Sequence, residues 1–367
     1  MKDDPGLASW LKLTLTPGLG AGSIRALLQQ FGLPQEVFQK SYAELARHAP
    51  AEALRAFDSE RVKQAVDATL AWAKRPENHV ITLADQAYPR TLLEIPDPPT
   101  VLYAVGRVAL LQGDKLAIVG SRNATSQGER NAESFAKTLG EAGLTIVSGL
   151  AMGIDAAAHR GGLGTSGSTI AVLGTGVDVV YPRRNEDLAA AIAKEGLLLS
   201  EFPLGTPPVA HNFPRRNRLI SGLGRGCLVV EAAAASGSLI TARLAADQGR
   251  DVFAIPGSIH SPLSKGCHAL IKAGAKLVES ADDILAELSG FQRTGFASTV
   301  VEDDDRSSEL SCLLKFMGHD PVDVDWLCVQ AGLSAEQVSS ELLRLELAGR
   351  IAALPGGLYQ RLSKGGG

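Results

Sequence analysis

The sequence predicts an α/β fold in which a doubly wound parallel sheet lies between a helical N-terminal domain and a small winged-helix domain. Three observations carry this prediction. From Lys115 onward, short apolar, β-prone runs recur, and they are continuous rather than alternating, as in strands buried on both faces. Helical segments separate the runs, which predicts parallel strands with helices on both faces. Almost every run ends in Gly or Ser, at the edge where such sheets bind ligands.

Residues 1–75 are predicted to form the helical domain. A tight turn, Pro17–Gly22, leads into a helix for which Ser23 is the expected N-cap. A Pro-Gly-Leu-Gly turn between helices is typical of a helix-hairpin-helix, whose glycines let backbone amides approach a phosphate. The alternative is a small helical protein-interaction module, because the segment contains no dense basic cluster.

Residues 76–290 are predicted to form the sheet domain. The first part is irregular, because its prolines at positions 89, 96, 98 and 99 cannot continue a helix, but residues 80–83 and 101–105 are candidate strands. The regular strands are expected at residues 116–119, 144–147, 169–173, 197–199, 227–230, 251–255 and 276–278. The intervening helices are expected at residues 128–140, 185–194 and 239–248, among others.

Residues 291–307 are predicted to be an acidic linker that contains Glu302–Asp305. Residues 308–367 then follow the order of a winged helix: helices at 309–317, 322–331 and 335–349, the third with Ser334 as N-cap, and a hairpin at 350–354 and 358–362. From Ser308 to Lys364 there are seven acidic and five basic residues. A recognition helix that approaches phosphates should be basic, so protein contact is favoured over duplex DNA, which stays the alternative.

Composition limits the function classes. With 367 residues, 45% of them hydrophobic, and a net charge of −4, the chain is not expected to coat duplex DNA by bulk charge. No signal peptide and no apolar run of membrane-spanning length are recognisable. The four cysteines are widely spaced, without a CxxC pair, so neither a metal site nor a disulfide framework is expected. We therefore expect a cytoplasmic protein with reduced thiols and no membrane contact.

The most distinctive local feature is a basic stretch, Asn212–Arg218, with the sequence NFPRRNR. No acidic residue occurs between Gly205 and Gly226. Clustered guanidiniums neutralise phosphates, and an aromatic ring offers a face on which a base can stack, so the stretch predicts binding of single-stranded nucleic acid through Phe213, Arg215, Arg216 and Arg218. The alternative is a solvated basic loop with Phe213 in the core.

A second candidate is the loop Gly120–Gly128, which follows the first regular strand and opens a helix. Backbone amides and hydroxyls at such a turn bind anionic oxygen, and Arg122 adds a charge beside Gly120 and Ser121. The loop lacks the Gly-x-Gly-x-x-Gly pattern of dinucleotide sites, so no NAD or other cofactor is expected. Asp155 and His159 could suggest catalysis, but a local hydrogen bond explains this spacing, and no catalytic residue is predicted.

Together these segments resemble the DprA/Smf family of DNA-processing proteins. The resemblance runs from about Tyr88 to Val278 through GSRNATSQG, SGLAMGIDAAAH, AVLGTGVDVVYP, SEFP, FPRRNRLISGL, EAAAASGSLITA and VFAIPG. It implies an extended Rossmann-like domain that dimerises, binds single-stranded DNA and loads the RecA recombinase during natural transformation. It also implies DNA contacts by Arg122 and the FPRRNR segment, and by Arg183 or Arg184.

The resulting interpretation is a non-enzymatic single-strand-binding recombination mediator. Two alternatives come from other classes. One is a nucleotide-processing enzyme, because this variant of the Rossmann fold resembles that of the phosphoribohydrolases, although their Pro-Gly-Gly-x-Gly-Thr loop is absent. The other is a duplex-DNA-binding regulator that acts through the winged helix.

Overall fold

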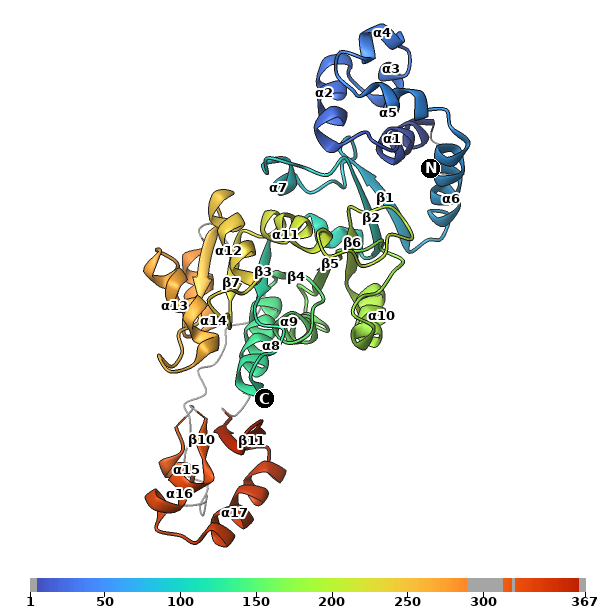
Figure 1. Cartoon of the computed structure of the whole chain (residues 1–367). Helices are drawn as coiled ribbons and strands as arrows, with labels where there is room; N and C mark the ends of the chain where they lie inside the picture. Colours follow the sequence, from blue (N-terminus) through green and yellow to red (C-terminus); the bar gives the residue numbers. More distant parts are fainter. Residues whose placement is uncertain (1–4, 289–312, 319–320, 363–367) are drawn as a thin grey trace.

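The computed structural model describes residues 5–288, 313–318 and 321–362 (Figure 1). The predicted acidic linker therefore lies outside the described residues. The N-terminal part is helical, as predicted. Its helices are α1 (Pro5–Leu15), α2 (Ala21–Phe31), α3 (Pro34–Val37), α4 (Tyr42–Leu45), α5 (Ala51–Ala56) and α6 (Glu60–Trp72).

The turn before α2 differs from the sequence prediction. Gly20 occupies the N-cap position and no side chain caps the helix, so the assignment of Ser23 as N-cap was wrong. Most of these helices share a core of their own around Leu13, Leu27 and Phe57. Trp10 and Leu11 of α1 instead pack with the sheet, so the predicted boundary near residue 75 does not separate two independent cores.

The centre of the molecule is a nine-stranded sheet in the order β1-β2-β6-β5-β4-β3-β7-β8-β9. Its strands are β1 (Asn78–Thr82), β2 (Val101–Gly106), β3 (Lys115–Val119), β4 (Thr145–Ser148), β5 (Thr169–Val172), β6 (Leu197–Ser200), β7 (Gly226–Val229), β8 (Asp251–Ala254) and β9 (Lys276–Leu277). The seven strands from β6 to β9 are parallel, and β2 and β1 extend the sheet in antiparallel pairing. The order 5-4-3-7-8-9 is the 3-2-1-4-5-6 order of a Rossmann fold, so the prediction of an extended, doubly wound sheet is confirmed.

Helices cover both faces of the sheet (Figure 1). On one face, α11 (Asn212–Leu223), α12 (Ser238–Asp247) and α13 (Lys265–Lys272) pack against the strands through Leu219, Leu239 and Cys267. On the other, α8 (Ser126–Glu141), α9 (Ile154–Gly162) and α14 (Ala281–Glu287) form a second core. The remaining segments of this part are α7 (Arg90–Leu93), α10 (Glu186–Glu195), and the 3-10 turns η1 (Val108–Leu111), η2 (Arg183–Asn185) and η3 (Pro262–Ser264).

The C-terminal part has the predicted winged-helix order. It comprises α15 (Leu313–Phe316), β10 (Val322–Asp323), α16 (Val324–Ala331), α17 (Ala335–Leu347), β11 (Ile351–Leu354) and β12 (Leu358–Arg361). The strands pair in the order β10-β12-β11. The hydroxyl of Ser334 accepts from the backbone amide of Gln337 at 3.3 Å, so the predicted N-cap of the third helix is confirmed.

Candidate functional site

The candidate site lies at the carboxyl ends of the parallel strands, where α11 crosses them. The chain reverses its direction along the sheet between β3 and β7, and loops after β3, β4 and β5 follow one another along the same edge. In doubly wound sheets ligands bind at this edge. The basic stretch Asn212–Arg218 is the first part of helix α11, which directs its side chains to different sides, so the alternative of a solvated basic loop is wrong.

Arg216 is buried rather than exposed. Its side chain passes beneath the loop after β4, where the guanidinium donates to the carbonyl oxygen of Gly149 at 2.7 Å and also to that of Val172. Burial lowers the pKa of Arg216 to about 10, and the nearby carboxyl of Asp155 opposes that shift. The sequence predicted that Arg216 contacts a phosphate, but in this structure its side chain is buried and donates to backbone oxygens of the protein itself.

Asp155 and His159 fix the same loop from the other side. The carboxylate of Asp155 accepts from the amides of Gly149 and Ala151 at 3.1 and 3.4 Å, while burial raises the pKa of this carboxyl and Arg216 opposes the rise. His159 accepts from the amide of Leu150 at 3.3 Å. Asn185 donates to the carbonyl oxygens of Leu150 and Ala151. These buried groups hold the backbone of the loop in place.

The loop after β3 is built on an internal carboxylate. Glu231, which follows β7, accepts from the amide and the hydroxyl of Thr125 at 2.9 and 2.6 Å, and its backbone oxygen accepts from the amide of Ser121. A Cβ at Gly128 would lie 2.4 Å from the Glu231 carboxyl, so glycine is required there. The expected anion site at the start of α8 is thus filled by the protein itself, and burial raises the pKa of Glu231.

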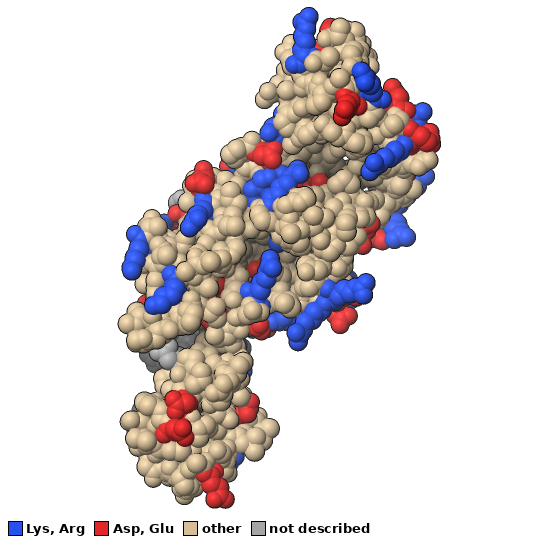
Figure 2. Space-filling model, in the orientation of Figure 1, with Lys and Arg blue, Asp and Glu red and all other residues tan. Residues whose placement is uncertain are grey.

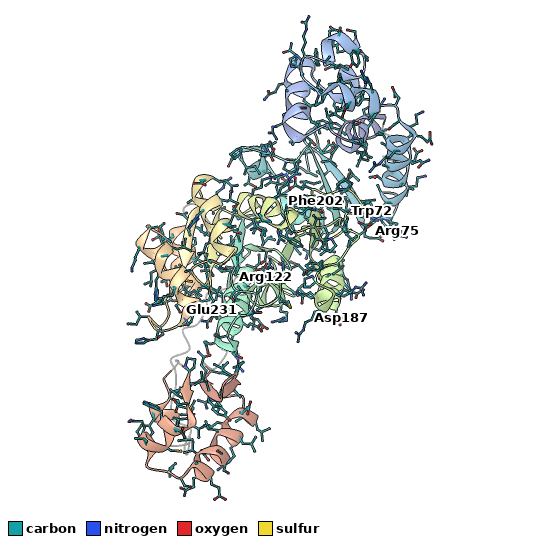
Figure 3. The ribbon with its side chains drawn as sticks, in the orientation of Figure 1. Trp72, Arg75, Arg122, Asp187, Phe202 and Glu231 are labelled. Atoms are coloured by element: carbon teal, nitrogen blue, oxygen red, sulfur yellow. The ribbon has the colours of Figure 1, made fainter. Side chains whose placement is uncertain are left out.

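Arg122 and Asn123 are exposed in this loop, whereas Ser121 is buried and Gly120 packs against Ile154. Arg122 and Glu231 lie close together in the view of Figure 3, and the backbone oxygen of Glu231 accepts from the amide of the residue before Arg122. Of the three residues predicted here, only Arg122 presents a side chain to solvent. Gly120 and Ser121 instead shape the turn that positions it.

An aromatic pair lies at the end of β5. Phe213, at the start of α11, packs over Gly174, where a Cβ would lie 2.8 Å from the ring. The ring of Tyr181 lies 5.5 Å from that of Phe213 and is 47% exposed. The next turn, η2, exposes Arg183 and Arg184. The sequence analysis did not predict Tyr181 as a binding residue. Its position just before Arg183 and Arg184 could have indicated one, because an aromatic ring next to arginines suits a nucleic-acid strand.

Arg215 and Arg218 leave α11 on another side and converge on Glu201, which follows β6. Their guanidiniums lie 3.1 and 2.5 Å from the same carboxylate oxygen. Arg218 also pairs with Asp97 at 3.4 Å, and its side chain is only 12% exposed. Arg215 is 49% exposed, and its guanidinium lies 5.6 Å from the centre of the Phe202 ring. Among the four predicted positions of the basic stretch, Phe213 and Arg215 are therefore the most available to a ligand.

The exposed cations of the site belong to different parts of the sequence: Arg122, Arg183, Arg184 and Arg215. Figure 2 shows basic side chains over the region that α11, α9 and α10 occupy in Figure 1, whereas the C-terminal part shows mainly acidic ones on this face. Within the described ranges, no group of three or more His, Cys, Asp and Glu side chains is arranged to hold a metal ion. None of the described helices is both long and apolar enough to cross a membrane.

Comparison with known proteins agrees with this architecture. The family model of DNA recombination-mediator protein A matches residues 79–289, and that of the DprA winged helix domain matches residues 299–357. The chain belongs to the DNA recombination-mediator protein A family. The resemblance to DprA/Smf proteins predicted from the motifs is thereby confirmed.

Two curated relatives illustrate the similarity. Protein Smf of Escherichia coli K12 is 44% identical over 310 residues, which cover 82% of each chain. The DNA processing protein DprA of Streptococcus pneumoniae is 52% identical over 206 residues, 56% of this chain and 73% of that protein. The match to Smf thus extends well beyond the sheet domain.

Two solved structures have a similar fold. The X-ray structure of DprA from Streptococcus pneumoniae has a TM-score of 0.67 and 43% identity, and it covers 78% of this chain and 99% of that one. DprA from Helicobacter pylori, described for its unique single-stranded DNA binding mode, has a TM-score of 0.52 and 30% identity over 57% of this chain and 94% of its own.

Proposed function

We propose that this protein is a cytoplasmic, non-enzymatic recombination mediator that binds single-stranded DNA. One observation carries the proposal: four exposed arginines and the aromatic pair of Tyr181 and Phe213 lie along the carboxyl edge of the sheet, on segments that buried side chains hold in place. Arginines neutralise phosphates of any sequence, and aromatic rings stack on unpaired bases, which a duplex does not offer.

The rest of the proposal rests on family membership. DprA of Helicobacter pylori has a single-stranded DNA binding mode, which supports the same ligand here. We extend the proposal to homodimerisation and to RecA loading on incoming strands during natural transformation, as the motif resemblance implies. A RecA assembly assay on protein-coated single strands, compared with uncoated strands, tests the loading step.

The direct test is fluorescence anisotropy with a labelled strand of about 20 nucleotides and its duplex, measured over a salt series. We expect a clear preference for the single strand. Replacing Arg122, Arg183, Arg184 and Arg215 by Ala should flatten the slope of log affinity against log salt by about 3, at roughly 0.7 for each phosphate contact. Lys194→Ala is the matched control, because this exposed lysine lies in the last turn of α10, at the opposite edge of the sheet. Equal slopes for the fourfold variant and the control would refute the proposal.

The nucleotide-processing alternative is less compatible with the loop after β3. In dinucleotide sites the helix N-terminus that follows the first strand receives a phosphate. Here the carboxylate of Glu231 accepts from Thr125 at that position and would repel a phosphate. Incubation with nucleoside monophosphates should release no free base. Release of base that disappears in a Glu231→Gln variant would favour the enzyme instead.

The duplex-binding alternative is opposed by charge. Helix α17, the counterpart of a recognition helix, carries Glu336, Glu341 and Glu346 against Arg344. Such a surface repels a phosphate backbone. Duplex affinity that equals or exceeds single-strand affinity in the anisotropy series would favour the regulator.

A further inference from the structure

A cavity lies between the N-terminal helices and the sheet domain, beside the proposed strand-binding edge. Its walls come from the start of α2, from the segment before β2, from the end of β6 and from α11. Its volume is about 190 Å³, which is smaller than the sites that enclose a whole drug-sized ligand. Figure 3 shows Phe202, one of its lining residues, closer to the N-terminal helices than Arg122 is.

The cavity combines apolar walls with a polar floor. Its apolar lining residues include Leu19, Ile24, Pro99, Val101 and Phe202. The polar groups are mainly those of Glu201, Arg215 and Arg218. Mostly apolar walls with a few fixed polar groups are typical of sites for flat organic ligands rather than for hydrated ions.

Two of the polar residues that line the cavity, Glu201 and Arg218, have side-chain atoms without hydrogen-bond partners. The Glu201 side chain is only 3% exposed, and both arginines approach the same oxygen, Oε2. Its other oxygen, Oε1, has no hydrogen-bond partner, and neither has Nη1 of Arg218. Buried polar atoms are nearly always paired, so the free acceptor of Glu201 and the free donor of Arg218, two residues already joined through Oε2, are groups that a ligand can satisfy.

The free acceptor of Glu201 and the free donor of Arg218 determine which class of ligand fits the cavity. A simple anion would satisfy the arginine but would face the free oxygen of Glu201. The edge of a nucleobase instead presents an N–H donor next to a ring nitrogen or carbonyl acceptor, and its flat ring suits apolar walls. Proteins read unpaired bases by such edge hydrogen bonds and by apolar contact.

The mouth of the cavity suits the phosphate of the same nucleotide. Helix α2 begins at the cavity, which Gly20 and Ala21 line, and it has neither a side-chain cap nor an acidic residue in its first turn, so no carboxylate of that turn neutralises its N-terminus. Arg215 lines the same cavity and is 49% exposed.

Gly20 has φ −71° and no atom within 4 Å of a built Cβ, so neither its conformation nor its packing requires glycine.

We propose that this cavity binds one base of the single strand that runs along the sheet edge, so that the N-terminal domain contributes to the DNA site. The inference rests on the proposed function, because it needs a strand held by Arg122 and the Phe213–Tyr181 pair. It assigns the N-terminal turn a role in the path of the strand rather than only in protein contacts.

The test fills the cavity without replacing any of the other DNA residues. Gly20→Phe places a ring in the open space that Gly20 lines, at a backbone conformation that Phe adopts without strain. Gly22→Phe is the matched control, because Gly22 also has no neighbour within 4 Å but does not line the cavity. Both variants should keep the wild-type melting temperature, which is measured first.

We expect Gly20→Phe to lower single-strand affinity about tenfold, as loss of one bound base does. The single-strand affinity of Gly22→Phe should stay within twofold of wild type. A single 2-aminopurine moved along an oligothymidine should report one position whose emission changes on binding to wild type and Gly22→Phe but not to Gly20→Phe. Wild-type affinity and an unchanged emission profile for Gly20→Phe would overturn the inference while the proposed function stands. Failure of the wild type to bind any strand would instead overturn the proposed function.

Discussion

The guanidinium of Arg216 lies directly against Gly149 and donates to its carbonyl oxygen at 2.7 Å. A Cβ at position 149 would lie 2.5 Å from Nη1 of Arg216, so the arginine fits only because residue 149 is glycine. The two residues lie 67 positions apart in the chain, in motifs that are separate in the sequence. Within the basic stretch, Arg216 is therefore a buried arginine that supports the site, whereas Arg215 is exposed and can meet a ligand.

Arg216→Ala should therefore act on stability. The loss leaves the carbonyl oxygens of Gly149 and Val172 without their donor and Asp155 without the nearby positive charge, which together should cost about 3–5 kcal/mol. Urea unfolding measures this loss. The matched surface variant, Arg122→Ala, should change the free energy of unfolding by less than about 0.5 kcal/mol. Equal stability of the two variants would contradict the structural role of Arg216.

Arg122→Ala should weaken binding of strands of every sequence to the same extent. A phosphate contact positions the strand without reading bases. Affinities for oligothymidine, oligocytidine and a mixed strand, measured under the same salt conditions, should fall by one common factor. A loss confined to one base composition would show that Arg122 reads a base edge.

Tyr181→Ala and Phe213→Ala should each weaken strand binding by about 1–3 kcal/mol, the value for one base–aromatic stack. The loss should persist at high salt, because stacking is not screened. Tyr42→Ala is the control, since Tyr42 of α4 is 51% exposed and Tyr181 47%. If Phe213 is only a core residue, its variant should lose about 3–5 kcal/mol of stability, and its folded fraction should bind normally.

His159 should make stability sensitive to acid. Burial lowers the pKa of His159 to about 3, compared with 6.5 for an exposed imidazole. Between these values the unfolded chain binds a proton that the folded chain does not, so the free energy of unfolding falls as pH drops, by at most about 1.4 kcal/mol per pH unit. In urea titrations at about pH 7, 6 and 5, wild type should lose more stability than His159→Gln. Parallel pH profiles for the two would show that His159 does not contribute this dependence.

Truncation after Gly290 should leave a folded dimer with single-strand affinity within about threefold of the full chain. The third helix of the winged-helix domain is acidic on balance, and Glu302–Asp305 add four negative charges before it. Within a Debye length of about 8 Å such charges repel phosphate. Light scattering and anisotropy on the truncated protein check both points. A loss of tenfold or more, about 1.4 kcal/mol, would make the winged helix part of the DNA site.

The sequence alone determined the class of fold and the approximate positions of the strands of the sheet. Continuous apolar runs mark strands buried on both faces, and the predicted runs at 116–119 and 227–230 differ from β3 and β7 by one residue. Local chemistry also predicted the cap at Ser334, because its capping box lies within four consecutive residues. The prediction that Arg122 lies in a turn after a strand is also confirmed, because the apolar run that ends at Val119 marks the end of β3.

The tertiary structure alone decided which side chains of the basic stretch face a ligand. Successive residues of α11 point about 100° apart, so Arg216 enters the interior while Arg215 and Arg218 turn toward Glu201. Sequence patterns report local periodicity, but they do not show that Glu231 fills the start of α8 or that Gly20 lines a cavity with Glu201. Those relationships join residues that are far apart in the chain, 106 positions in the case of Thr125 and Glu231, and only the folded order of the strands brings them together.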